Sequence, residues 1–245
     1  MITVVILTKN SEKTISNTLN SLKDFDEVII LDTGSEDNTL DIVKEYKNTK
    51  IHKNEFIGFG ILRNLGASFA KNDWILALDS DEVLSDNLIK EIFSIQLNNR
   101  TIYDIPFHNY YNNRFIKCCG WHPESHVRLY NKKTTSFKEK LLHEKIIEND
   151  LRVLKLKNPI FHYSFNSIDD FIKKTMIYSS LFAQENKNKK KSSFLKAISH
   201  GIFAFIKSYF LKRGIFFGFE GFIISLYNAN CAFYKYLKLY EINRK

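Results

Sequence analysis

Three carboxylates within four residues follow the apolar run Trp74–Leu78: they are Asp79, Asp81 and Glu82. A continuous apolar run of this kind is typical of a strand buried on both faces of a parallel sheet. If the strand continues to Asp81, Asp79 and Asp81 project to the same side, where a cation between them would relieve their repulsion. Mg²⁺ or Mn²⁺, bound by one or two carboxylates and by substrate phosphates, meets that need. The alternative is that the acids only cap the next helix, and this stretch alone leaves both interpretations open.

The residues before this stretch alternate between strand-like and helix-like patterns, which is typical of a doubly wound α/β sheet. The predicted strands are Ile2–Thr8, Glu27–Leu31 and Ile51–His52, and a helix at Phe59–Ala70 precedes the strand that begins at Trp74. Right-handed crossovers would place the ends of the first, second and fourth strands along one edge of the sheet. We therefore expect Thr8, Asp32 and Asp79 to lie close together, which unrelated helix caps would not do.

The pattern changes after a helix predicted at Leu84–Leu97. Strand-like segments return at Ile102–Tyr111, His126–Tyr130 and Leu151–Ile160, and the chain becomes helical from Ser167. The later strands would complete a mixed sheet and form one wall of a cleft. The sequence thus predicts an α/β fold with a Rossmann-like mixed sheet flanked by helices, and a C-terminal helical extension.

Composition narrows the classes of partner and compartment. The 245 residues have a formal net charge of +9, which indicates an anionic partner such as a nucleotide, a nucleic acid or an acidic membrane surface. Three cysteines without Cys-x-x-Cys spacing suggest neither a disulfide framework nor a zinc site. Met1 leads straight into a strand without a signal peptide, so we expect a cytoplasmic protein. No uncharged run reaches the roughly 18 to 20 residues that span a bilayer.

Residues 187–219 combine eight Lys or Arg residues with many Phe and Ile residues, and they contain no Asp or Glu. Basic residues interleaved with bulky apolar ones are typical of a helix that lies on an anionic membrane surface. The alternative is a core helix with solvated lysines, and both remain open. A nucleic-acid surface is disfavoured, because large aliphatic side chains serve no purpose against phosphates.

Four motifs taken together resemble the family-2 glycosyltransferases of GT-A fold. They are Thr8-Lys-Asn, Asp32-Thr-Gly-Ser, Leu62-Arg-Asn-Leu-Gly and Asp79-Ser-Asp-Glu. Within that family, four parts of the chain resemble the lipopolysaccharide core β-1,4-glucosyltransferases. These are Leu62-Arg-Asn-Leu-Gly, Asp73-Trp-Ile-Leu-Ala-Leu-Asp-Ser-Asp-Glu, Arg128-Leu-Tyr with His143-Glu144, and Arg213-Gly-Ile-Phe-Phe-Gly-Phe-Glu-Gly-Phe.

The resemblance implies a role for each matching residue. Thr8 and Asp32 would contact the uracil of a UDP-sugar, and Arg63 would lie near the nucleotide. Asp79 would contact the ribose or the metal, and Asp81 would bind the metal that bridges the diphosphate. In one departure, the usual Asn-Glu pair after the first strand reads Asn10-Ser11 here, with Glu12 one place later. A ribose contact from that Glu is therefore not assigned.

Sugar transfer with inversion also requires a carboxylate that takes the proton of the acceptor hydroxyl. The candidates are Glu124, Glu139 and Glu144. Glu144 is preferred because His143-Glu144 matches the motif of the subgroup, and Glu124 is second. Arg128 is a candidate for binding the diphosphate or the base, and His162 for binding the metal or a phosphate. The alternatives are an ordinary salt bridge for the arginine and a buried structural role for the histidine.

The resemblance thus implies a metal-dependent inverting glycosyltransferase that uses Mg²⁺ or Mn²⁺. It would move a hexose, glucose from UDP-glucose, to a lipid-linked oligosaccharide such as lipopolysaccharide inner core. Residues 1–100 would bind the nucleotide sugar, 101–165 would form the acceptor side, and 166–245 would attach the enzyme peripherally to the inner face of the cytoplasmic membrane. Another UDP-sugar or acceptor, and a non-catalytic membrane-binding module, are the alternatives. The module leaves Asp32, Asp79 and Asp81 unexplained.

Overall fold

The computed structural model describes every residue except 140–144, 149 and 245. The chain forms two compact units. Unit 1 comprises Met1–His108 and Glu124–Tyr163, and unit 2 comprises Asn109–Pro123 and Ser164–Lys245. The structure thus groups residues 109–123 with the C-terminal helices, although the sequence pattern assigned them to the segment 101–165.

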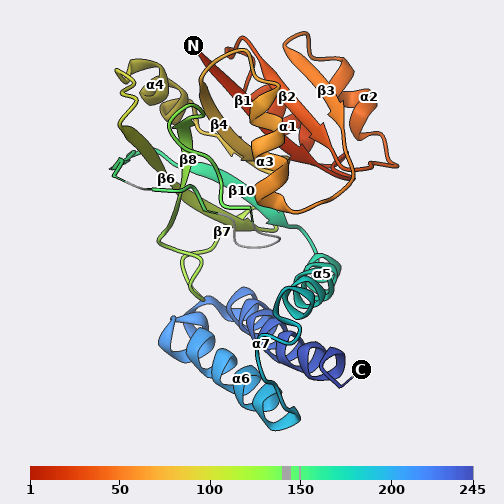
Figure 1. The fold of residues 1–245 in the computed structure, drawn as a ribbon. Coiled ribbons are helices and arrows are strands. Elements are labelled where there is room, and N and C mark those ends of the chain that lie inside the picture. Colours follow the sequence, from red (N-terminus) through yellow and green to blue (C-terminus); the bar gives the residue numbers. More distant parts are fainter. Residues whose placement is uncertain (140–144, 149, 245) are drawn as a thin grey trace. The chain divides into compact units, whose positions relative to one another are not determined.

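Ten strands among the described residues form one mixed sheet, in the order β3-β2-β1-β4-β8-β6-β10-β5, with β7 and β9 paired to β6 (Figure 1). Strands β1 to β4 are parallel where they pair, and β8 runs antiparallel to β4. The strands are β1 (Ile2–Thr8), β2 (Val28–Asp32), β3 (Thr49–Lys53), β4 (Trp74–Asp79), β5 (Glu82–Leu84), β6 (Thr101–Tyr111), β7 (Arg114–Phe115), β8 (Glu124–Asn131), β9 (Arg152–Lys155) and β10 (Ile160–Phe165). The predicted mixed sheet is confirmed.

Helices cover both faces of the parallel strands. They are α1 (Ile15–Asn20), α2 (Thr39–Lys44), α3 (Phe59–Ser68) and α4 (Asp86–Ser94). Because side chains alternate along a strand, Val4 and Ile6 of β1 pack in one cluster with α1, α2 and α4, whereas Val5 packs with α3 on the other face. Helix α3 lies especially close to β1, since a Cβ added at Gly66 would lie 2.5 Å from Val5 Cγ1. Gly66 therefore sets the position of α3 on the sheet.

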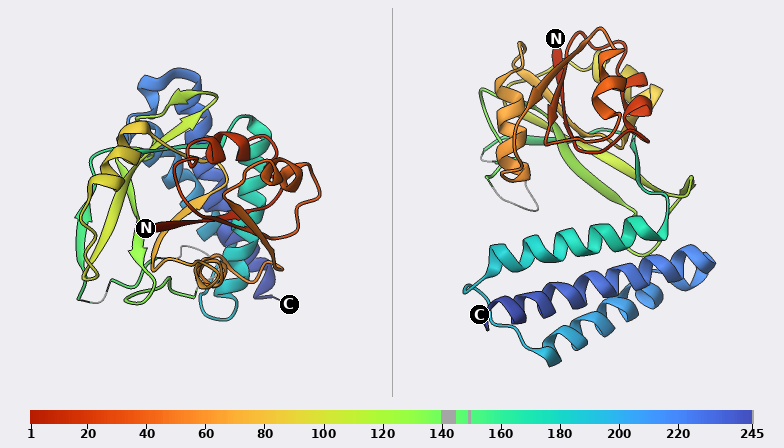
Figure 2. Two further views of the ribbon diagram at one scale, coloured as in Figure 1. Left: turned by 90° about the horizontal axis from the view of Figure 1, so that it is seen from above. Right: turned by 90° about the vertical axis from the view of Figure 1, so that its right-hand side faces the viewer.

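Three helices form most of unit 2: α5 (Ile168–Asn186), α6 (Phe194–Ile206) and α7 (Gly218–Ile242). Helix α7 packs against both α5 and α6 and lies between them (Figure 2). A π-helical turn at Lys207–Leu211 extends α6, and a 3₁₀ turn at Gly214–Phe217 precedes α7. The sequence therefore predicted the helical extension correctly, including the start of α5, where Ser167 and Asp170 form a capping box.

Three local predictions are wrong. The helix predicted at Leu84–Leu97 is preceded by the short strand β5 and begins only at Asp86, with Ser85 as its N-cap. Glu82 therefore does not cap this helix. The strand predicted at Leu151–Ile160 is two strands, β9 and β10, because each pairs at a different place in the sheet.

One helical stretch among the described residues, Phe194–Leu211, is long and apolar enough to cross a membrane, judged by length and composition alone. It includes Lys196 and Lys207, so the search for uncharged runs in the sequence missed it. Its mean hydropathy is 1.2, and only 17% of it is buried inside the protein. This low burial distinguishes it from the core helix of a soluble protein.

The opposite edge of the sheet from the acidic strand ends contains a buried carboxylate, Glu27. It accepts hydrogen bonds from Thr3 Oγ1 at 2.7 Å, Lys50 Nζ at 2.8 Å and the backbone N–H of Lys71 at 2.8 Å. These donors come from β1, β3 and the loop before β4. Burial raises the pKa of Glu27, but the hydrogen bonds lower it further, so the net pKa is below the usual 4.5.

We expect Glu27→Gln to lower the free energy of unfolding by about 1–3 kcal/mol at neutral pH, because buried donors lose a charged acceptor. Since folding lowers the pKa of Glu27, its stabilising effect is present above pH 4.5 and is lost as the pH falls through the folded-state pKa. Urea denaturation at pH 7 and at about pH 3.5 should show the wild-type and variant free energies converging at low pH. The exposed Glu45→Gln is the control, and a pH-independent difference would contradict this account.

Candidate active site

The carboxyl ends of β1, β2 and β4 are aligned at one edge of the sheet. Thr8 pairs in register with Asp32, and Leu7 pairs with Asp79. This confirms the predicted clustering of residues that lie far apart in the sequence. In open α/β sheets, ligands bind beyond the carboxyl ends of the strands. The candidate active site therefore lies at this edge.

The loop after β2 is organised by the buried carboxylate of Asp32. Its oxygens accept hydrogen bonds from the backbone N–H groups of Gly34 at 3.1 Å and of Ser35 at 3.1 and 3.2 Å. Gly34 has a φ of 95°, a left-handed conformation that glycine adopts without strain. The loop after β1 is joined to it, because the backbone N–H of Asn10 donates to Ser35 Oγ at 2.9 Å. Asp32 therefore holds both loops in one fixed arrangement.

Buried polar atoms without a partner are concentrated near this edge. Among the described residues, Thr8 Oγ1, Arg128 Nε and Tyr130 OH are buried and have no hydrogen-bond partner within the protein. An unpaired buried polar atom costs about 1–3 kcal/mol. Thr8 and Arg128 were both predicted to contact the nucleotide sugar, and a polar ligand would satisfy these two atoms.

Asp79 lies between two guanidinium groups. Arg63 of α3, whose side chain is 2% exposed, donates from Nη2 to Asp79 Oδ1 at 2.8 Å. Arg128 of β8 donates from Nη2 to Asp79 Oδ2 at 3.3 Å and to Glu82 Oε1 at 2.6 Å. Glu82, fully buried, also accepts the backbone N–H of Asp79 at 2.9 Å. Four charged side chains thus form one connected cluster, which we call the arginine–carboxylate cluster: Arg63, Asp79, Glu82 and Arg128.

The two acids of this cluster differ in their proton affinity. Burial raises the pKa of Asp79, but Arg63 and Arg128 outweigh it and hold this pKa well below its usual value. Burial raises the pKa of Glu82 to about 7, against the opposing attraction of Arg128. Asp79 is therefore ionised at neutral pH. Both oxygens of Asp79 face guanidinium groups, so this carboxylate positions the two arginines, and its predicted contact with the ribose or the metal stays a prediction.

A second pair lies beside the cluster. His162 Nε2 of β10 lies 3.4 Å from Asp81 Oδ1, and both side chains are partly exposed, at 23% and 21%. Among the described residues, no three His, Cys, Asp or Glu side chains are grouped to hold a metal ion. A metal here would take two protein ligands, Asp81 and His162, and further oxygens from substrate phosphates and water. Mg²⁺ and Mn²⁺ accept that kind of incomplete protein site, so the pair fits the predicted ion.

Two of the three candidates for the catalytic base, Glu124 and Glu139, lie among the described residues. Glu124, at the start of β8, lies 3.0 Å from His126 Nε2, and both side chains are substantially exposed. Glu139 is exposed as well. The preferred candidate, Glu144, and its neighbour His143 lie outside the described residues. The choice of base stays a prediction.

Sequence reasoning missed two parts of the site. It did not assign Glu82 to the arginine–carboxylate cluster, and it did not predict that Ser11 Oγ and Ser80 Oγ lie 2.7 Å apart, joining the loops after β1 and β4. One signal for Glu82 was present in the sequence: an acid directly precedes the apolar pair Val83-Leu84. A charged residue at the start of a buried strand needs a partner of opposite charge.

We expect Arg128→Met to lower the free energy of unfolding by about 1–3 kcal/mol, because the carboxyl groups of Asp79 and Glu82 lose the donor that Arg128 supplies in the buried cluster. The double variant Arg128→Met with Glu82→Gln should lose less than the sum of the two single losses, since the Arg128–Glu82 hydrogen bond can be lost only once. Urea denaturation of the four proteins of this cycle measures the coupling. Arg152→Met, on the exposed strand β9, is the matched control. Simple additivity of the two losses would contradict the connected cluster.

Comparison with known proteins agrees with this geometry. Residues 3–167 match the model of glycosyl transferase family 2. An uncharacterized glycosyltransferase of Rickettsia typhi is 32% identical over 258 residues, which cover 100% of this chain and 88% of the relative. One from Rickettsia bellii is 32% identical over 264 residues, covering 99% and 87%.

Among solved structures, S. aureus TarS 1–349 in complex with UDP-GlcNAc superposes with a TM-score of 0.51 at 18% identity, covering 94% of this chain and 90% of that chain. This likeness supports the predicted GT-A type of fold. The chain belongs to glycosyl transferase family 2 and is a glycosyltransferase that uses a nucleotide sugar.

Proposed function

We propose that this glycosyltransferase moves glucose from UDP-glucose, with inversion, to a lipid-linked oligosaccharide such as lipopolysaccharide or lipooligosaccharide inner core. The observation that carries the proposal is the arginine–carboxylate cluster beside the Asp81–His162 pair, at the carboxyl ends of the strands. Two arginines and a metal-binding pair together suit a diphosphate leaving group. The solved structure of TarS holds UDP-GlcNAc, which supports a uridine nucleotide as donor.

Each residue then has a distinct task. Thr8 Oγ1 and the loop fixed by Asp32 would bind the uracil. Arg128, oriented by Asp79, would bind the diphosphate or the base, and the buried Arg63 would lie near the nucleotide and hold Asp79 in place. Asp81 and His162 would hold Mg²⁺ or Mn²⁺, which when bound acts as a Lewis acid on the leaving group.

The acceptor hydroxyl must lose its proton as it attacks the anomeric carbon. Glu144 is the proposed base, and Glu124 is the alternative. The proton would pass from the hydroxyl to the carboxylate while the C–O bond to the diphosphate breaks. The diphosphate leaves as UDP, its added negative charge facing the two arginines. Because the cluster is already assembled, its side chains need to move little as negative charge develops on the diphosphate.

Asp81→Asn should lower metal-dependent UDP-glucose turnover by about 100-fold, because a neutral amide binds a hard divalent cation poorly. The measurement is release of UDP from a panel of UDP-sugars, with and without Mn²⁺ and Mg²⁺. Asp86→Asn, an exposed acid at the start of α4, is the matched control and should keep full activity. Unchanged metal-dependent turnover in Asp81→Asn would overturn the metal assignment, and a different preferred UDP-sugar would replace glucose as the donor.

Unit 2 supports the membrane part of the proposal. The apolar side chains Phe203, Leu211 and Phe216 are exposed at 60%, 70% and 81%, and residues 187–219 contain no acid. Helix α6 packs along α7, which carries Glu220, Lys235 and Lys238. A helix tied to such a charged neighbour lies more readily on an anionic surface than across a bilayer. We therefore propose a cytoplasmic enzyme held peripherally on the inner face of the cytoplasmic membrane.

Changing Lys187, Lys189, Lys190 and Lys191 to Gln should lower binding to anionic vesicles by at least about tenfold, since each lysine near such a surface gives about 1 kcal/mol. Flotation with phosphatidylglycerol-containing vesicles at low and high salt measures this, and salt should release the wild-type protein.

The matched control removes the same charge from exposed lysines of unit 1: Lys23, Lys44, Lys47 and Lys90. Equal loss of binding in both variants would show that net charge alone, rather than the 187–191 tract, attracts the protein to the membrane.

A further inference from the structure

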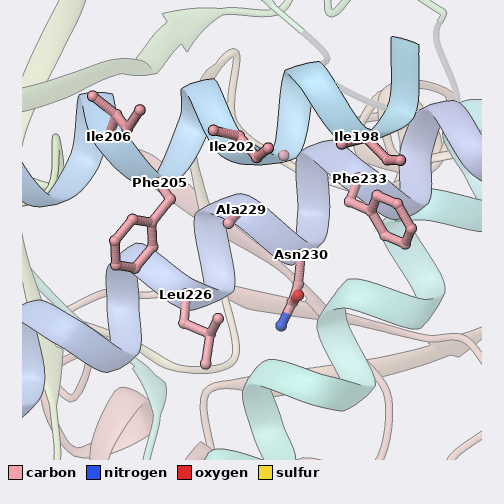
Figure 3. A pocket seen from close by; sticks show the side chains of 9 residues that line it. Ile198, Ile202, Phe205, Ile206, Leu226, Ala229, Asn230 and Phe233 are labelled. Carbon is pink, nitrogen blue, oxygen red and sulfur yellow. The ribbon is translucent and has the colours of Figure 1, made fainter. Parts of the chain in front are cut away.

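An apolar groove lies between α6 and α7, and the proposed sugar transfer makes no use of it. Its volume is about 350 Å³, within the range of about 300–1,000 Å³ that small-molecule sites occupy. Helix α6 lines it with Ile198, Ile202 and Phe205, and α7 lines it with Leu226, Ala229, Phe233 and the polar Asn230 (Figure 3). We call this site the α6–α7 groove.

Small residues shape the floor of the groove. Gly201 faces α7, and a Cβ added there would lie 3.1 Å from Phe233 Cβ. The helices therefore approach closely at this point, and the short side chain of Ala229 leaves room beside them. Ile198 and Phe233 lie toward one end of the groove, and Phe205 and Leu226 toward the other (Figure 3). An elongated apolar site of this form suits a linear hydrocarbon chain.

Two lysines flank the stretch of α6 that lines the groove, Lys196 before it and Lys207 after it. Lys196 lies one half-turn before Ile198, donates from Nζ to the backbone carbonyl of Lys191 at 3.2 Å, and lies 5.0 Å from the centre of the Tyr236 ring on α7. At the other end, Lys207 directly follows Ile206, the last residue of α6. An apolar centre with cationic ends is complementary to a molecule that has a hydrocarbon chain and an anionic head group.

We propose that the α6–α7 groove binds one hydrocarbon chain of an anionic phospholipid, whose phosphate contacts the lysines at an end of the groove. This inference rests on the proposed membrane partner and names the site at which a single lipid is held. A second copy of the chain is the competing occupant. The shared positive charge of residues 187–219 opposes it, because two such surfaces repel each other.

Dodecyl phosphate, kept below its micelle concentration, is the probe for this site. Isothermal titration of the full chain should show one saturable site. Dodecyl maltoside, which has the same chain without the charge, should bind more weakly, and inorganic phosphate alone should show no saturable binding. Absence of saturable dodecyl phosphate binding would overturn the proposal, as would equal affinity for inorganic phosphate.

Two neighbouring residues of α6 give a matched pair of variants. Ile202 lines the groove and is 58% exposed, whereas Phe203 is 60% exposed and does not line it. Ile202→Asp should weaken dodecyl phosphate binding by at least about tenfold, because a carboxylate enters the apolar site and repels the phosphate. Phe203→Asp should leave the affinity within about twofold. Equal weakening by both substitutions, with helical content unchanged by circular dichroism, would overturn the groove as the site.

Vesicle flotation separates this inference from the membrane attachment on which it rests. Flotation without dodecyl phosphate binding would overturn the groove and leave the membrane partner supported. Dodecyl phosphate binding without flotation would support the groove and overturn the membrane attachment. Self-association in the absence of lipid that Ile202→Asp abolishes would assign the groove to a second copy of the chain and overturn the lipid.

Discussion

The charge balance around Asp79 is the constraint on which the rest of the site depends. Two guanidinium groups are taken out of water at the edge of the sheet, and this is favourable only where carboxylates meet them with good geometry. Asp79 and Glu82 supply those carboxylates from the end of β4 and the start of β5. Because burial favours the neutral form of Glu82 while Asp79 stays ionised, the cluster tends toward a net positive charge. A diphosphate is the kind of ligand that such a cluster accommodates.

The two ends of the parallel strands differ in their polar contacts: side chains at one end stabilise the sheet, and side chains at the other end form the candidate site. At the amino-terminal edge, Glu27 connects three segments through three hydrogen bonds. At the carboxyl edge, Thr8 Oγ1 and Arg128 Nε have no hydrogen-bond partner among the described residues. One edge therefore holds the strands in register, and the other edge keeps polar atoms available for a ligand. Rigid strands between the two edges hold the site loops in place.

The sequence predicted the parallel half of the sheet well, for a physical reason. The β-branched strands are buried on both faces, so their apolar runs are continuous, and parallel connection places their ends on one edge. Thr8, Asp32 and Asp79 could be grouped on that basis alone. Glu82 and Arg128 could not, because their contact depends on how β8 pairs with β4, with Leu76 opposite Leu129. No local pattern encodes a pairing between strands that lie about fifty residues apart.

In unit 2 as well, the sequence predicted local properties but not the packing of one element against another. The sequence revealed the basic and apolar character of residues 187–219, since composition is local. It did not reveal that Gly201 brings α6 against Phe233 of α7, or that the side chains around this contact form a groove. Composition decides whether a helix can lie against lipid, whereas the small residues at a helix crossing decide whether the helices leave space for one lipid chain. A polar sugar and an apolar chain need different environments: polar side chains gather at the strand ends of unit 1, and an apolar groove lies between two helices of unit 2.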